Sequence, residues 1–315
     1  MDLQTKLRQE ARKLLEEKLV DVVIGYEDEG APLRTTPCFI TDPQDVDRLV
    51  WNPFCDHNLA RYLTARKDKA AVVAKGCDTR AIVVLINENQ IERKNVNILG
   101  MPCGGIVDRK KIYNHLKNGD VREAVLKDKV ITVKGLEFTA DLMVDDFLAD
   151  CCLSCRHRNP VLCDVQIGEN LPPLDVKDEY KKIKQLEEST SEERWEYFRK
   201  TLSKCIRCYA CREACPLCYC QQCFTDQNFP AWVGKTTDIS DTIVFHIMRA
   251  FHTTGRCVDC GACERSCPNN VDIRMLTKKI AKDVKELFGD EAGLQLEEKA
   301  PLSFYNEDDP QDFIK

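Results

Sequence analysis

The chain has 315 residues, of which 31% are charged, and a formal net charge of −6. That length leaves room for two domains. The acidic balance gives no basic footprint for nucleic acid, and no apolar run approaches the roughly 18–20 residues that cross a bilayer. The N-terminal sequence is charged and lacks the apolar core of a secretory signal. Nineteen cysteines without such a signal indicate the reducing cytoplasm of an anaerobe, where a disulfide framework is not expected.

Residues 1–170 read as alternating helices and strands, an α/β pattern. Apolar residues recur at helical spacing over 3–19. Three short apolar runs predict strands, at residues 20–24, 70–74 and 96–99. Helices are predicted over 78–87 and 108–117, each with an aspartate as its N-cap, and a further strand over 130–138. Strand–loop–helix units repeated in this way predict parallel strands with crossover helices.

The second half of the chain has a different pattern. Residues 171–190 are polar with paired prolines and are predicted to be a linker. Helices are predicted over 191–203, 238–251 and 273–288, so that the domain from 191 to 290 is expected to be all-helical. The tail from 291 to 315 mixes acids with aromatic residues such as Tyr305 and Phe313, and is either a frayed end or a segment that docks onto a partner subunit.

Two complete ferredoxin motifs lie in the helical half, each with the spacing C-x2-C-x2-C-x3-C-P. Three cysteines of such a motif bind one [4Fe–4S] cluster, and the fourth binds the other cluster. We therefore predict one cluster on Cys205, Cys208, Cys211 and Cys267, and a second on Cys257, Cys260, Cys263 and Cys215. Two zinc sites are the alternative, but structural zinc has no use for the third cysteine or the proline. Two neighbouring clusters of this kind indicate a protein that transfers single electrons.

A long insert, residues 216–256, separates the two motifs. With the helix predicted after it, this insert resembles the α-helical ferredoxin domains of heterodisulfide reductase and succinate dehydrogenase iron–sulfur subunits. The resemblance implies a helical domain around two [4Fe–4S] clusters, without the β-hairpins of small bacterial ferredoxins.

A third group of cysteines, Cys151, Cys152, Cys155 and Cys163, ends the α/β half. Three of them could bind another cluster if a fourth ligand came from one of two strand-end loops, which carry Cys77 and Cys103. On the residues alone, either loop could supply it.

Four stretches within about residues 35–170 resemble the beta-subunit family of coenzyme F420-reducing hydrogenase and F420-linked formate dehydrogenase. They are VAKGCDTRAI from Val73, LGMPCGG from Leu99, DCCLSC from Asp150 and CDVQIG from Cys163. The resemblance implies a [4Fe–4S] site on Cys103, Cys152, Cys155 and Cys163, with Cys77 as the spare. It also implies flavin adenine dinucleotide (FAD) beside that cluster. The chain has no GxGxxG or other phosphate-binding loop, so a scaffold without flavin is the competing interpretation.

The remaining cysteines carry weaker signals. Cys218, Cys220 and Cys223 directly follow the first motif and predict either a fourth metal site or thiols without metal. The candidates to complete that site are Cys38, Cys55, Cys77 and Cys151. Cys38 and Cys55 are otherwise expected to be packing residues. The five histidines form no catalytic group, but His246 and His252 fall on a predicted helix from which either could donate a hydrogen bond to a cluster sulfur.

These patterns predict an iron–sulfur electron-transfer subunit of a multisubunit anaerobic oxidoreductase of the hydrogenase, formate dehydrogenase or heterodisulfide reductase type. Its partners would be other subunits of a redox complex or ferredoxin. The alternative is a flavoenzyme that exchanges hydride with a soluble donor and passes electrons to its clusters. A third class is an iron–sulfur scaffold or redox sensor. No catalytic residue is predicted.

Overall fold

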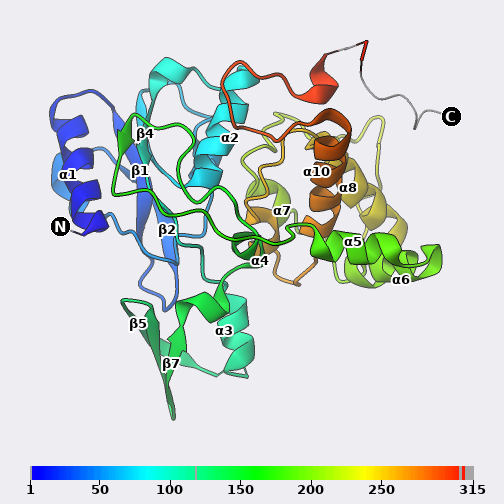
Figure 1. The fold of residues 1–315 in the computed structure, drawn as a ribbon, viewed down its shortest axis with the longest axis horizontal. Coiled ribbons are helices and arrows are strands. Elements are labelled where there is room, and N and C mark those ends of the chain that lie inside the picture. The colour runs from blue at the N-terminus through cyan, green and yellow to red at the C-terminus, as the bar shows by residue number, and fades with distance from the viewer. Residues whose placement is uncertain (1, 118, 305–306, 309–315) are drawn as a thin grey trace. The chain divides into compact units, whose positions relative to one another are not determined.

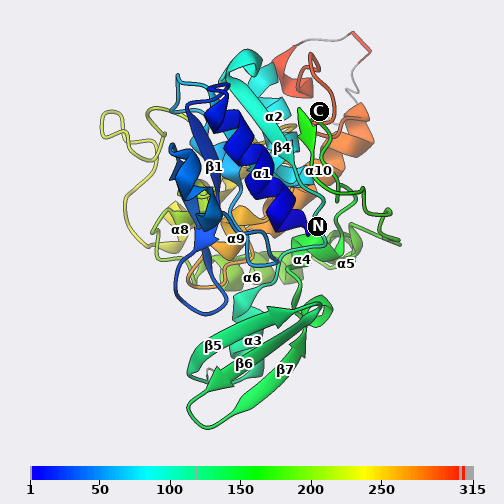
Figure 2. The same ribbon diagram turned by 90° about the vertical axis from the view of Figure 1, so that its left-hand side faces the viewer.

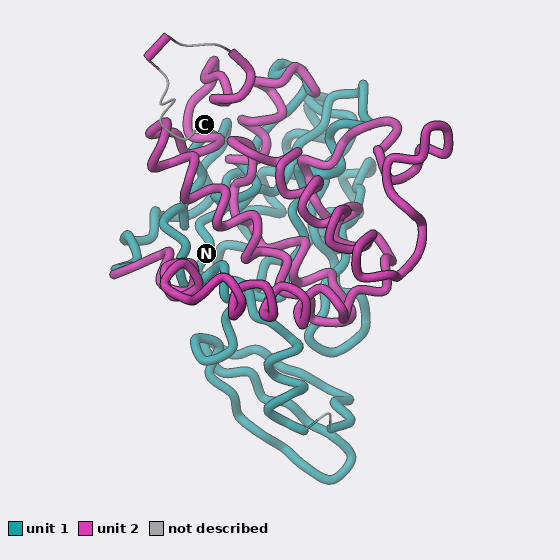
Figure 3. Tube along the Cα trace, turned by 90° about the vertical axis from the view of Figure 1, so that its right-hand side faces the viewer, with its two compact units in different colours: residues 1–79, 91–176 teal, residues 80–90, 177–315 magenta. Residues whose placement is uncertain are grey.

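The computed structural model describes residues 2–117, 119–304 and 307–308. It divides into two compact units (Figure 3). Unit 1 comprises residues 1–79 and 91–176, and unit 2 comprises residues 80–90 and 177–315. Part of the predicted tail, including Tyr305 and Phe313, lies outside the described residues. Among the described helices, none is both long and apolar enough to span a membrane.

Unit 1 is built on a five-stranded sheet with the order β2-β1-β3-β4-β8 (Figure 1). Its strands are β1 (Val22–Asp28), β2 (Thr35–Ile40), β3 (Ala70–Ala74), β4 (Val96–Gly100) and β8 (Val165–Gln166). The pairs β1–β3, β3–β4 and β4–β8 are parallel. The predicted α/β class is thus confirmed for this part of the chain. The strand β2 was not predicted; it pairs antiparallel with β1, which makes the sheet mixed.

The first two helices follow the predicted pattern with shifted ends. Helix α1 (Leu3–Glu16) begins at an Asp2 N-cap and lies across one face of the sheet (Figure 2). Helix α2 (Gly76–Asn87) begins two residues earlier than predicted, which places Asp78 in its first turn. Every residue of β3 is buried, as expected for a central parallel strand covered on both faces. The carboxyl ends of β3 and β4 therefore present their loops from a rigid core.

A second, three-stranded sheet belongs to unit 1. It is antiparallel in the order β5-β6-β7, with β5 (Val121–Lys127), β6 (Val130–Gly135) and β7 (Thr139–Met143). Helix α3 (Arg109–His115) starts at the predicted N-cap Asp108, and its Ile112 packs with Ile131 and Val133 in a separate core. The strand predicted over 130–138 is therefore present as β6, in this small sheet.

The described secondary structure of residues 177–304 is helical, without a strand in that range. The helices are α5 (Lys181–Glu188), α6 (Ser191–Leu202), α7 (Ala210–Glu213), α8 (Ile239–His252), α9 (Ala262–Arg265) and α10 (Arg274–Phe288). Helix α6 begins with a capping box formed by Thr190 and Glu193. Helix α5 lies within the segment predicted to be a linker. The remaining short elements of the chain are α4 (Asp150–Leu153), η1 (Pro43–Arg48), η2 (Leu59–Tyr62), η3 (Arg93–Asn95), η4 (Val144–Phe147) and η5 (Pro301–Ser303).

The core of unit 2 contains cysteines that the sequence predicts as ligands. Cys211 and Cys267 are buried in it beside Leu202, Phe245 and Val271. Cys205 and Cys263 pack against the same cluster. The predicted metal-binding residues and the hydrophobic core therefore occupy one region of this unit.

Candidate metal centres

The two ferredoxin motifs have left-handed residues at the same two positions. In the first, Arg207 and Tyr209 on either side of the second cysteine have φ of 54° and 60°; in the second, Asp259 and Gly261 have φ of 53° and 68°. A left-handed conformation costs a non-glycine residue about 1–3 kcal/mol and is retained where the surroundings require it. Alternation of right- and left-handed residues turns successive N–H groups toward one point, a geometry that binds anions and iron–sulfur clusters. The conformation fits the predicted ligand role.

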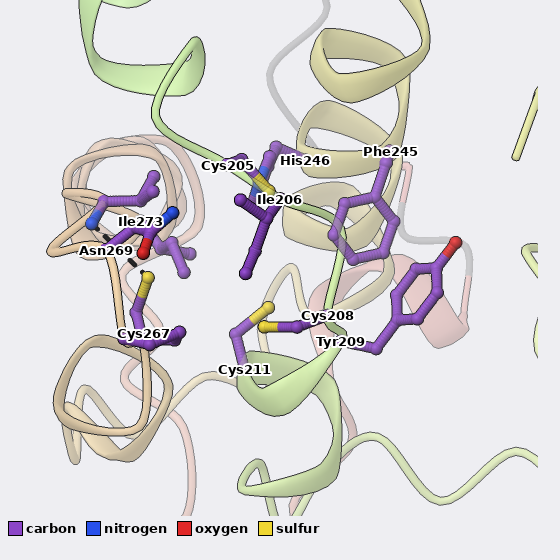
Figure 4. Close-up of a pocket in the computed structure, with 12 residues that line it drawn as sticks. Cys205, Ile206, Cys208, Tyr209, Cys211, Phe245, His246, Cys267, Asn269 and Ile273 are labelled. Carbon is purple, nitrogen blue, oxygen red and sulfur yellow. Dashed lines mark hydrogen bonds between the residues drawn. The ribbon is translucent and has the colours of Figure 1, made fainter. Parts of the chain in front are cut away.

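The first predicted set of ligands lines one pocket (Figure 4). Cys205, Cys208 and Cys211 from the first motif and Cys267 from the second all contribute to it, with Phe245 and other apolar side chains. The sulfur atoms are turned toward the space between them (Figure 4). This places the fourth cysteine of the second motif with the first three cysteines of the first motif, as the prediction requires.

The cysteines of the second set lie near enough to one another to raise each other's pKa values. Burial, Asp259 and the sulfurs of Cys263 and Cys215 raise the pKa of Cys257 to about 12. Burial and Cys215 also raise the pKa of Cys260, and the same sulfur raises that of Cys263. Cys215, the fourth cysteine of the first motif, is thus a neighbour of all three cysteines of the second. These thiols are protonated in the metal-free protein, so binding of a cluster would release protons.

Several of these sulfurs accept a hydrogen bond from the backbone N–H two residues later. The Arg207 N–H donates to Cys205 Sγ at 3.4 Å. Equivalent bonds reach Cys257 from Asp259, Cys260 from Ala262 and Cys215 from Leu217. Donors directed at sulfur stabilise its negatively charged form and are one of the means by which proteins set cluster potential. Both sets therefore fit thiolate ligands.

Arg249 on α8 is a buried cation among the cysteines. Its side chain is 4% exposed, and Nη2 donates to the Cys211 carbonyl at 3.0 Å. Nε has no hydrogen-bond partner in the described part of the chain. Burial alone would lower the pKa of Arg249, but the sulfurs of Cys263, Cys215 and their neighbours outweigh it and raise that pKa. Among the described residues no carboxylate forms an ion pair with Arg249, which fits a site whose negative charge comes from bound thiolates.

His246 lies one turn earlier on α8, in the wall of the first pocket. Its Nε2 is 3.3 Å from Cys205 Sγ. Burial, with the charges of Arg249 and Arg207, lowers the pKa of His246 to about 4, which keeps the ring neutral at pH 7. His252, the other predicted donor, is exposed and packs edge-on against Phe224.

The third set surrounds the loop that follows β4 in unit 1. The glycines on either side of Cys103 leave room for two other cysteines: a Cβ at Gly100 would lie 2.7 Å from Cys163 Cβ, and one at Gly105 would lie 3.5 Å from Cys152 Cβ. Cys152 Sγ also accepts from the Ile106 N–H at 3.3 Å, and the Cys155 N–H donates to the Cys152 carbonyl at 3.3 Å. The structure thus brings Cys103, Cys152 and Cys163 to one loop, with Cys155 close in the chain.

Sequence reasoning missed a buried ion pair beside this loop. Lys75 and Asp78 have side chains 1% and 0% exposed, with Nζ 3.0 Å from Oδ2. Nζ also donates to the His57 carbonyl at 2.8 Å and to the Tyr26 hydroxyl. Burial opposes the charge on Lys75, but Asp78, Tyr26 and the sulfurs of Cys77 and Cys103 outweigh it and raise the pKa of Lys75. The signal in the sequence was a lysine directly after a buried strand, three residues before an aspartate.

The cysteines of the fourth predicted site have separate surroundings. A hydrogen bond between Cys215 and Cys218 raises the pKa of the first and lowers that of the second. Cys220 is exposed, whereas Cys223 bonds to Arg212. Within the described residues, no three His, Cys, Asp or Glu side chains form a group that could hold a single metal ion. The ligands of a cubane each bind a different iron atom, so they do not converge on one point in this way.

Cys77, Cys38 and Cys55 lie in unit 1. Cys77 Sγ is 3.9 Å from Asp78 Oδ1, beside the buried ion pair. Cys38 and Cys55 are buried, and burial is the main cause that raises their pKa values to about 11 and about 12.

The chain is similar to beta subunits of F420-dependent formate dehydrogenase, which confirms the predicted resemblance to that beta-subunit family. It is 25% identical to subunit beta of the enzyme from Methanocaldococcus jannaschii, over 88% of each chain. It is 26% identical to subunit beta of formate dehydrogenase 1 from Methanococcus maripaludis, over 76% of this chain and 77% of the relative. The first similarity extends beyond residues 35–170, on which the resemblance was based, because 88% of the chain is more than those residues and all that precede them.

Other comparisons add less. No protein-family model matches the chain. A chain of the F420-reducing [NiFe] hydrogenase complex from Methanosarcina barkeri matches with a TM-score of 0.37 and 15% identity, over 48% of this chain and 58% of that one. Similarity at that level supports no structural argument.

Proposed function

We propose that this chain is an electron-transfer subunit of a multisubunit oxidoreductase of the F420-linked formate dehydrogenase or hydrogenase type. Its relatives are named as beta subunits of such enzymes. The observation that supports the proposal best is the gathering of Cys205, Cys208 and Cys211 with Cys267, taken from both ferredoxin motifs, around one pocket. That crossed arrangement is typical of ferredoxins with two [4Fe–4S] clusters and has no counterpart in zinc sites.

In this proposal three sets of cysteines hold [4Fe–4S] clusters. They are Cys205, Cys208, Cys211 and Cys267; Cys257, Cys260, Cys263 and Cys215; and Cys103, Cys152, Cys155 and Cys163. Bound clusters would supply the capacity to accept and release single electrons. The all-helical ferredoxin domain and its fusion to the α/β part follow from the same assignment. We place the protein in the reducing cytoplasm, where free thiols persist.

The residues of the protein have clear tasks in this arrangement. The left-handed loops direct N–H groups at sulfur, and apolar side chains such as Phe245 keep water from the first pocket. Arg249 provides positive charge between the two sets of unit 2. In unit 1, buried Lys75 provides positive charge beside Cys103. These groups favour thiolates over thiols, which is the condition for binding iron.

The decisive measurement is iron and acid-labile sulfide in the full chain purified without oxygen. About twelve irons per chain are expected from three four-iron clusters. About eight irons would mean that the set with Cys103 holds no cluster. About sixteen would require a fourth cluster on a site that uses Cys218, Cys220 and Cys223. A colourless protein with stoichiometric zinc and no reducible paramagnetic signal would end the proposal.

Cysteine variants test the crossed arrangement. Cys208→Ala and Cys267→Ala are expected to change the same paramagnetic signal, while Cys215→Ala and Cys260→Ala change the other. The buried Cys38, replaced by alanine, is the matched control and should leave iron content unchanged. If Cys267→Ala changed the signal that Cys260→Ala also changes, the arrangement would be wrong.

The flavoenzyme alternative remains a prediction. It requires FAD, which would be released from the purified chain on denaturation and seen by absorbance and fluorescence. Clusters without released flavin would favour the carrier. Reduction by ferredoxin, measured as bleaching of the cluster absorbance, tests that partner separately.

A further inference from the structure

Helix α8 carries a buried histidine, His246, whose ring lies beside a predicted cluster ligand. His246 is 2% exposed, and its ring packs against Phe245 with the ring centroids 4.8 Å apart. A buried polar ring is costly unless it makes hydrogen bonds. His246 lies beside Cys205 (Figure 4). Its Nε2 is 3.3 Å from Cys205 Sγ, and its Nδ1 has no partner in the described part of the chain. The sulfur is therefore the one described group that satisfies this side chain.

The direction of the hydrogen bond follows from the chemistry of the sulfur. A neutral imidazole has one N–H, and the other nitrogen carries a lone pair. A cysteine bound to iron is a thiolate, which has no proton and can only accept. Nε2 must therefore carry the hydrogen when Cys205 is a ligand, and Nδ1 keeps the lone pair. The His246 side chain therefore offers a hydrogen-bond donor to Cys205 of the first set.

We propose that His246 donates its Nε2–H to Cys205 Sγ and thereby raises the reduction potential of the cluster on Cys205, Cys208, Cys211 and Cys267. The inference rests on the proposed function, because it assumes that this cluster is present. Reduction adds negative charge to the cluster and its sulfurs, so a donor to sulfur stabilises the reduced state more than the oxidised one. His246 is a positioning residue: it touches a ligand and takes no part in chemistry itself.

The effect is confined to one of the two sets in unit 2. The other histidine of unit 2, His252, is exposed on α8. The cysteines of the second motif have backbone donors such as the N–H of Asp259. His246 would thus separate the potentials of two clusters whose loops are otherwise alike.

The test uses the full chain loaded with clusters and follows both paramagnetic signals during a redox titration. His246→Phe keeps an aromatic ring against Phe245 and removes the donor. Its first cluster should be harder to reduce, by up to about tenfold in the equilibrium constant, or about 59 mV for one electron. His246→Gln places an amide N–H near the position of Nε2 and should restore most of the potential. Cys208→Ser, which changes that cluster's signal, identifies which of the two signals belongs to it.

His252→Phe is the matched control, on the same helix but exposed, and should leave both potentials unchanged. A loaded His246→Phe protein with an unchanged first potential would overturn the inference, as would an equal shift of both clusters. If that variant failed to load, the wild-type protein labelled with ¹⁵N-histidine decides. Coupling of one ¹⁵N nucleus to the first signal is expected, and its absence refutes the hydrogen bond. Absence of iron in the wild type would instead refute the proposed function itself.

Discussion

Replacing Arg249 by methionine should destabilise the protein loaded with clusters but not the metal-free protein. Without metal, the raised pKa values of Cys211, Cys215 and Cys263 keep these thiols neutral at pH 7. Buried Arg249 then has no carboxylate partner in the described part of the chain. Replacing even a buried ion pair by apolar side chains of similar size is often neutral or stabilising, by about 1–4 kcal/mol, because the charges no longer lose their hydration. The lost hydrogen bond to the Cys211 carbonyl, worth about 1.5–3 kcal/mol for a charged donor, offsets part of this gain. A change between about zero and a small stabilisation is expected.

With clusters bound, the same substitution removes the cation that faces the thiolates of both sets. Loss of one partner from a buried charge pair costs about 3–5 kcal/mol. Urea unfolding, monitored by hydrogen exchange of the α8 and α10 amides, measures the free energy of unfolding of unit 2 in both forms. Arg249→Lys is the control that keeps the charge and should fall between wild type and Arg249→Met in the loaded form. Equal destabilisation in both forms would show that Arg249 acts through packing alone, and the reasoning would fail.

Three further predictions concern other parts of the chain. Gly100→Ala should lower the iron content by about four atoms per chain, because its Cβ would collide with Cys163 in the third cysteine set. The control is Gly104→Ala, whose Cβ would have its nearest neighbour 4.0 Å away. This control should leave the iron content unchanged. Asp78→Asn should destabilise unit 1 by about 3–5 kcal/mol, measured by urea unfolding and hydrogen exchange in β3, since it leaves the buried Lys75 charge without its carboxylate. Burial opposes ionisation of Asp272, but hydrogen bonds from a lysine and a tyrosine outweigh it and lower its pKa below 3.8. Its contribution to stability is therefore present above about pH 4 and lost as the pH falls further; Asp272→Asn should weaken the metal-free chain at pH 7 and flatten its stability between pH 5 and 3, and an unchanged pH profile would refute this.

The sequence predicted most where spacing alone determines geometry. The ferredoxin spacing predicted that Cys267 lies with the cysteines of the first set, and it lines the same pocket. Apolar runs predicted the parallel strands β1, β3 and β4. The antiparallel strand β2 was missed because its short run contains a proline and a cysteine and has no clear alternation. The helix α5 was missed because five of its eight residues are charged. A short segment with so few apolar residues has the composition of a linker until its packing partners are known.

The surroundings of the cysteines could not be predicted because they depend on which face of a helix turns inward. The range of α8 was predicted almost correctly, but apolar side chains occur all around it. Val244, Ile247, Met248 and Phe251 are exposed, while Phe245 is buried. Hydrophobic periodicity therefore gives no unique inner face for this helix. Lys75 posed the same difficulty, since a lysine after a strand is usually solvated and its burial depends on a carboxylate that only the fold brings close.

The position of α8 links folding of unit 2 to the properties proposed for both of its clusters. His246 and Arg249 are three residues apart, so they share one helical face, and Phe245 anchors that face in the core. The same core contains Cys211 and Cys267, which means that the ligands and the groups that adjust them are fixed by a single packing arrangement. A change that shifts α8 should therefore alter the environment of both sets together, whereas a change at His246 alone should alter only the first. That difference separates a structural effect of the helix from a specific effect of its side chains.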